Sequence, residues 1–132
     1  MDQMLSKWQP AALSLFRFIT GLLLFQFGVA KILKYPDVPN FAKVTPLSLF
    51  GVAGMIELVF GGLLMLGLFT RPVAFILSGE MACAYFIEHF PRNFFPLLNG
   101  GTLAIMACFA CLYLSIAGGG PISVDAMLGK KD

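Results

Sequence analysis

Charged side chains are scarce in this chain. Asp, Glu, Lys and Arg together make up 12% of its 132 residues, whereas a soluble domain carries about 25%. A water-soluble chain with so little charge would expose large apolar patches and aggregate. The shortage therefore excludes an ordinary soluble domain. The mean hydropathy of +0.85 favours a lipid bilayer as the solvent of this protein.

Histidine occurs only once, as His89, and its scarcity excludes several kinds of site. A single histidine cannot hold a haem iron from both sides, and no Cys, His or acidic residues show the spacing of a metal site. The basic residues are scattered and the net charge is only +2, so we expect no nucleic-acid partner. The sequence also lacks phosphate-binding loops and serine-nucleophile motifs.

The three cysteines do not indicate a disulfide framework. Cys108 and Cys111 form a C-x-x-C pair, but the pair falls inside an apolar run. Reactive pairs of this kind sit at a helix N-terminus, where the pKa of the thiol is lowered. Both cysteines belong to a stripe of small residues, which is the usual surface for close helix packing in membranes. We favour packing over reversible oxidation for this pair.

Four apolar segments are long enough to cross about 30 Å of hydrocarbon as helices. Polar, proline-containing turns separate them and block helix continuation. The first segment shows no signal-peptide cleavage site, so we expect it to remain as a span. The sequence predicts an all-α membrane protein, a single domain over residues 1–132 that forms a four-transmembrane-helix bundle. Its predicted spans cover residues 12–33, 47–69, 73–90 and 97–117.

Four charged residues fall within these predicted spans, namely Arg17, Lys31, Glu57 and Glu80. A charge at the bilayer centre costs at least ~2.5 kcal/mol, so such residues usually face the bundle interior. At ~1.5 Å per residue, Arg17 and Glu80 are nearly level, which predicts an ion pair between them. Lys31 is placed to reach toward Glu57. The alternative for Arg17 and Lys31 is that their side chains extend to the membrane interfaces.

The spacing of small residues indicates which helix faces meet. On the first span, Gly21 and Gly28 share a face with the two basic residues. On the second, Gly54 and Gly61 share a face with Glu57. Glycines allow two helices to approach closely, so we expect these faces to be buried. The charges they carry form either a structural network that fixes helix register or a site that handles a proton or a ligand.

The connection after the third span holds two further candidate residues, His89 and Asn99. They lie among aromatic residues typical of a membrane interface. Each could contact a polar head group or a quinone, and the alternative is a solvated interfacial side chain.

An even number of spans places both termini on one side, which carries five Lys and Arg residues against four on the other. This charge bias predicts cytoplasmic termini.

A set of short motifs spread over the chain resembles the DoxX family of small four-span bacterial inner-membrane proteins. The resemblance implies a four-helix bundle in the inner membrane and links the chain to membrane redox or thiol-stress complexes and to a thiosulfate:quinone oxidoreductase subunit. The motifs are Gly28-x-x-Lys31, Glu57-x-x-x-Gly61-Gly62, Gly67-Leu68-Phe69-Thr70-Arg71-Pro72, Glu80-Met81-Ala82-x-Ala84-Tyr85-Phe86, His89-x-Pro91, Phe95-Pro96-x-x-Asn99-Gly100-Gly101 and Gly118-Gly119-Gly120-Pro121-x-Ser123-x-Asp125.

Three functions follow from the resemblance together with the charged residues. The first is a non-catalytic subunit or scaffold of a membrane redox complex, with a redox-complex protein or a second copy of the chain as partner. The second is a quinone-linked oxidoreductase subunit with Glu80, His89 and Asn99 at its site. The third is a small transporter or channel. We rank them in this order, with the lipid bilayer as the common environment and quinone as the cofactor implied.

Overall fold

The computed structural model describes residues 2–35, 45 and 47–129, and all regular structure within these ranges is helical. The elements are α1 (Asp2–Ser6), α2 (Gln9–Gly28), η1 (Val29–Leu33), α3 (Leu49–Leu66), α4 (Thr70–Ala84), η3 (Tyr85–His89), η4 (Phe90–Arg92), α5 (Pro96–Asn99), α6 (Thr102–Ala117) and α7 (Val124–Met127). η1 and η3 are π-helical turns, and η4 is a 3₁₀ turn.

Three continuous helical stretches are long and apolar enough to cross a membrane, which confirms a helical membrane protein. They cover Gln9–Leu33, Leu49–Leu66 and Thr70–Arg92. The fourth apolar helix, α6, is shorter at 16 residues. It begins at Thr102 instead of residue 97 because Gly100, in the left-handed conformation with φ +73°, ends the short helix α5. Glycine adopts this conformation without steric cost.

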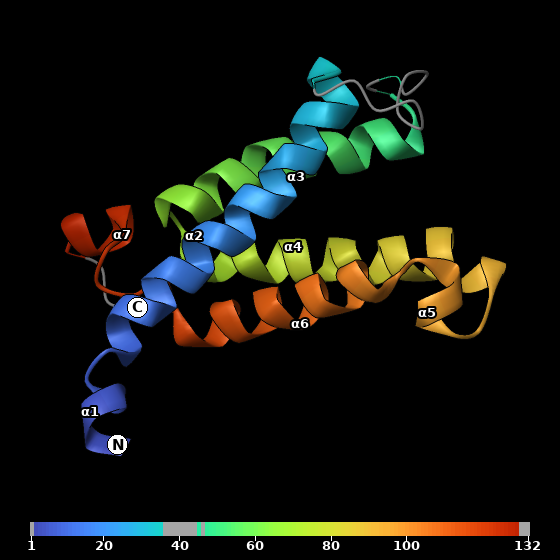
Figure 1. The fold of residues 1–132 in the computed structure, drawn as a ribbon. Coiled ribbons are helices and arrows are strands. Elements are labelled where there is room, and N and C mark those ends of the chain that lie inside the picture. The colour runs from blue at the N-terminus through green and yellow to red at the C-terminus, as the bar shows by residue number, and fades with distance from the viewer. Residues whose placement is uncertain (1, 36–44, 46, 130–132) are drawn as a thin grey trace.

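The long helices form two antiparallel pairs (Figure 1). Helix α2 crosses α3, whereas α4 lies along α6, and the first and last described segments are at the same end of the molecule. The α2–α3 pair diverges from the α4–α6 pair toward the ends that carry η1 and α5. This end is called the open end below, and the end that carries α1 and α7 is called the terminal end.

Glycine faces hold the α2–α3 pair together, as the spacing predicts. A β-carbon added at Gly28 would lie 2.3 Å from the backbone nitrogen of Leu58. A β-carbon added at Gly61 would lie 2.8 Å from the backbone nitrogen of Phe25. Neither distance is sterically possible, so the two backbones are in direct contact. Because lipid gives helices no hydrophobic reason to associate, such close packing is what joins them.

The α4–α6 pair encloses the apolar core. Leu77 on α4 and Leu114 on α6 are fully buried, together with Leu64 from α3. Cys111 is also fully buried in this cluster. Nearby, the Ser78 hydroxyl donates a hydrogen bond of 2.8 Å to the carbonyl oxygen of Cys108. The packing interpretation of the C-x-x-C pair is therefore confirmed for Cys111.

The segment Gly118–Met127, called the clasp below, folds back over the terminal end of the helices. The Arg17 guanidinium donates hydrogen bonds to the carbonyl oxygens of Gly119 (2.6 Å) and Ile122 (2.9 Å). It also donates to the carbonyl oxygen of Met65, at 3.2 Å, in the last turn of α3. The amide of Ile122 donates to the Ser14 hydroxyl at 3.0 Å. These contacts fasten the clasp to α2 and α3.

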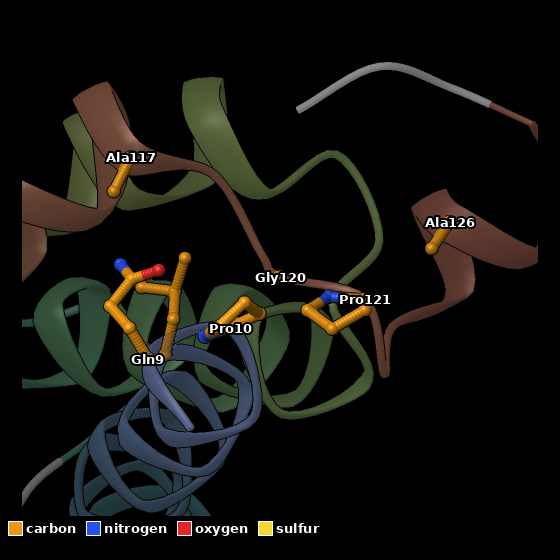
Figure 2. Close-up of a pocket in the computed structure, with 7 residues that line it drawn as sticks. Gln9, Pro10, Ala117, Gly120, Pro121 and Ala126 are labelled. Carbon is orange, nitrogen blue, oxygen red and sulfur yellow. The ribbon is translucent and has the colours of Figure 1, made fainter. Parts of the chain in front are cut away.

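The clasp also caps α4 through Asp125. Its carboxylate accepts hydrogen bonds from the backbone amides of Phe69 (2.9 Å) and Thr70 (3.0 Å). These amides belong to the first turn of α4, which has no intrahelical acceptors for them and carries a partial positive charge. Where the clasp meets the start of α2 there is a small pocket of about 320 Å³, and its lining includes Pro10 from α2 and Pro121 from the clasp (Figure 2).

Replacing Asp125 with alanine is expected to destabilise the protein by about 1–3 kcal/mol, because the buried amide of Thr70 and the partly buried amide of Phe69 lose this acceptor. The midpoint of thermal unfolding in detergent, followed by circular dichroism, should fall. Asp2→Ala removes the same charge at an exposed position and should leave the midpoint unchanged. Equal midpoints for the two variants would show that the Asp125 cap contributes nothing.

Candidate functional site

A partly open cavity of about 1090 Å³ lies between the two helix pairs. All four long helices contribute to its wall, which is mostly aliphatic and aromatic, with side chains such as Phe16, Leu23, Ile76 and Met106. Its size is at the upper end of ligand pockets, which are typically apolar with a few placed polar groups. Its polar groups include three of the charged residues predicted from the sequence, Lys31, Glu57 and Glu80, called the charged trio below.

Lys31 and Glu57 form an ion pair in the wall of this cavity. The Lys31 ammonium lies 3.0 Å from Oε1 and 3.3 Å from Oε2 of Glu57. Only 11% of the Lys31 side chain and 2% of the Glu57 side chain are exposed. Gly54, one turn before Glu57, admits the lysine, since a β-carbon there would lie 2.8 Å from Lys31 Cβ. The expectation that Lys31 reaches Glu57 is confirmed.

Glu80 lies beside this ion pair but outside it. Its two carboxyl oxygens are shielded from solvent and have no hydrogen-bond donor among the described residues. Both Glu57 and Lys31 are close enough to act on its carboxyl group electrostatically. The trio thus combines one positive charge with two carboxyl groups in an apolar surrounding.

The predicted Arg17–Glu80 ion pair is wrong. Arg17 binds carbonyl oxygens of the clasp and of α3 at the terminal end. The prediction measured its depth from residue 12, the start of the first predicted span, but the helical stretch Gln9–Leu33 has 25 residues and α3 has 18. Helix α2 extends beyond its neighbour, so Arg17 lies level with the end of α3. Glu80, ten residues into α4, is about 15 Å along its helix from that end.

Both π-helical turns lie at the open end, next to the charged residues. Lys31 is in η1, and the turn η3 contains Glu88 and His89. A π-turn adds a residue to the helical repeat, which redirects the side chains that follow, and such turns are frequent at functional sites. Glu88, His89 and Arg92 line the cavity. Its wall therefore has a polar rim at the open end in addition to the charged trio.

Asn99 and His89 meet in this rim, as their placement in one connection suggests. The backbone carbonyl oxygen of Asn99 lies 3.0 Å from His89 Nδ1. The Asn99 amide nitrogen donates to the Tyr85 hydroxyl (3.1 Å) and to the carbonyl oxygen of Asn93 (2.9 Å), and its side-chain oxygen accepts from the Gly101 amide (2.8 Å). His89 lines the cavity, whereas Asn99 is buried behind it with both amide hydrogens used.

Two residues of this arrangement had no assigned role in the sequence prediction, Tyr85 and Asp125. Tyr85 stacks on His89 with ring centroids 6.3 Å apart and accepts the hydrogen bond from Asn99. Its spacing of four residues from His89 on one helix was a usable signal. Asp125 binds backbone amides, and no pattern of side chains in a sequence marks such a partner.

A family model for DoxX matches residues 12–90, which is more than half of the chain. The chain belongs to the DoxX family. A 41% identical protein of Haemophilus influenzae (strain Rd), described as an uncharacterized protein, aligns over 96% of this chain and 98% of its own length. No solved structure matched significantly. The DoxX match includes the whole charged trio and His89, whereas Asn99 and the clasp lie beyond it.

Proposed function

We propose that this DoxX protein is a quinone-binding, non-catalytic subunit of a redox complex in the bacterial inner membrane. The observation that carries the proposal is the apolar cavity with the charged trio in its wall. Quinones combine an apolar tail with a ring that bears carbonyl acceptors. The aliphatic wall suits the tail, and the carboxyl of Glu80 and the ring of His89 suit the carbonyl groups.

The membrane arrangement in this proposal has four spans with cytoplasmic termini. Helix α6 covers only about 24 Å at 1.5 Å per residue, so it crosses the hydrocarbon layer with help from α5 and the aromatic residues around it. The position of both terminal segments at one end supports an even number of crossings. The bias of Lys and Arg residues supports the cytoplasmic side.

A partner subunit supplies the electrons in this proposal. The region from η3 to α5 offers a surface for it, because Phe86, Phe90, Phe94 and Phe95 are exposed there. Successive rings in this group make edge-to-face contacts, such as Phe90 with Phe94 at 6.2 Å. Aromatic residues are enriched at the centres of protein interfaces. A scaffold role without a quinone would use this same surface.

A transporter or channel is the third candidate. It would need a path through the terminal end, where Arg17 and Asp125 bind the backbone of α3, α4 and the clasp. The cavity supports quinone binding better than transport. Its polar lining residues Glu88, His89 and Arg92 lie at the open end, away from the terminal end that a transport path would have to cross.

A matched pair of alanines on α4 tests the quinone proposal. Ala84 lines the cavity, whereas Ala82, on the same helix and equally half-buried, does not. Ala84→Phe is expected to reduce the quinone that co-purifies from native membranes at least tenfold, because the added ring fills the binding space. Ala82→Phe should retain the wild-type amount. Mass spectrometry of the extracted lipids gives the measurement, and absence of quinone from the wild-type protein would refute the proposal.

A further inference from the structure

We propose that Glu57 and Glu80 share one proton, and that Glu80 offers this proton as a hydrogen bond to an acceptor oxygen of an uncharged apolar ligand. The second half of this inference rests on the proposed function, because it assigns the ligand chemistry of the same cavity. The first half concerns the protein alone. It makes the charged trio neutral as a whole, with one positive and one negative charge.

The charge balance of the cavity supports a shared proton. Lys31 neutralises Glu57 at 3.0 Å, which leaves Glu80 as an additional carboxylate in an apolar wall. Placing an uncompensated charge in such an environment costs several kcal/mol. Among the described residues, the charges of Glu57 from α3 and Lys31 from η1 act on the Glu80 carboxyl, and Glu80 acts in turn on Cys111 from α6. None of them supplies a second positive charge.

The contact between the two carboxyl groups supports the same conclusion. The two carboxyl groups act on each other electrostatically, and two ionised carboxylates repel each other and can only accept hydrogen bonds. The oxygens of Glu80 have no donor among the described residues. A proton on this pair removes one of the two like charges, since like charges side by side cannot both ionise readily, and it gives Glu80 an O–H group as a donor.

The neutral trio selects the kind of ligand. A cationic or anionic ligand would bring an unpaired charge into the apolar cavity, whereas an uncharged molecule would not. Lys31 already donates to Glu57, so the proton of the carboxyl pair is the donor that Glu80 can present to the cavity. A carbonyl oxygen on an apolar molecule is the acceptor that fits this donor. The ligand class is therefore an uncharged carbonyl compound with an apolar body.

Infrared spectroscopy of the purified protein tests the shared proton without any ligand. A protonated carboxyl group has a carbonyl band that a carboxylate lacks, and labelling glutamate with carbon-13 shifts this band. Wild-type protein is expected to show a shifted band that Glu80→Gln loses. The half-buried Glu88 carboxyl at the rim is not part of the pair, so Glu88→Gln should keep the band. Absence of the carbon-13-shifted carboxyl band from the wild-type spectrum would overturn the inference.

Titration with a short-chain quinone tests the hydrogen bond to the ligand. Binding is monitored by the change in the fluorescence of the protein. Glu80→Gln keeps a donor and should bind within a few-fold of wild type. Glu80→Met removes the donor and should weaken binding about tenfold. Equal binding by Glu80→Met would overturn the ligand contact. If wild-type protein retains the carboxyl band but binds no quinone, the proposed function fails while the shared proton stands.

Discussion

Lys31→Met is expected to reduce the free energy of unfolding by about 3–5 kcal/mol, because it leaves the buried Glu57 carboxylate without its partner. Such a loss is comparable to the whole stability of a small domain, so much of the protein should fail to accumulate in membranes. Chemical unfolding in mixed micelles, together with the amount of folded protein recovered, gives the measurement.

The double variant Lys31→Met/Glu57→Gln separates the ion pair from simple packing. With both charges removed, no uncompensated charge is buried, and most of the lost stability should return. Lys34→Met serves as the control, since Lys34 is exposed. If Lys31→Met were as stable as wild type, or if the double variant were no more stable than Lys31→Met, the Lys31–Glu57 pair would not stabilise the fold.

Gly28→Val is expected to separate α2 from α3. A β-carbon at this position would lie 2.3 Å from the backbone nitrogen and 2.6 Å from Cα of Leu58, and a helix backbone cannot yield as a flexible side chain can. Overpacking a core typically costs about 1–3 kcal/mol. Removing a helical glycine stabilises a helix by only about 1 kcal/mol at most. The clash therefore outweighs this gain, and the net change in stability is a loss. The thermal midpoint in detergent should fall.

Gly79→Val provides the matched control for this prediction. Gly79 also lies within a long helix, but a β-carbon there would have nothing within 4 Å. Its midpoint should remain near that of wild type. If Gly28→Val unfolded at the same temperature as Gly79→Val, close contact between the α2 and α3 backbones would no longer explain how this pair associates.

Helical periodicity in the sequence was enough to predict the meeting of α2 and α3. Gly21, Gly28 and Lys31 are seven and three residues apart, and Gly54, Glu57 and Gly61 are three and four residues apart. Residues with this spacing occupy one face of a helix wherever the helix is placed. Two such faces that combine glycines with opposite charges therefore predict both the contact and the Lys31–Glu57 pair.

Periodicity could not predict the contacts of Arg17 because they depend on how far one helix extends past another. That offset is set by the glycine contacts between α2 and α3, which fix the two helices at a particular register. The site lies where the helix pairs diverge, and the cavity there results from the crossing angles of four helices. The two π-turns at the open end add a further displacement of side chains that a regular helix would not have.

The clasp has a consequence for the order in which the protein is built. Residues 118–127 leave the ribosome after all four long helices have been made. Until then, the first amides of α4 lack the carboxylate of Asp125, and Arg17 lacks the carbonyl oxygens of Gly119 and Ile122. In a membrane such groups are costly to leave unsatisfied. Bundle assembly is therefore completed by a segment synthesised after the four long helices, so newly inserted helices remain free to adjust their register until the clasp binds.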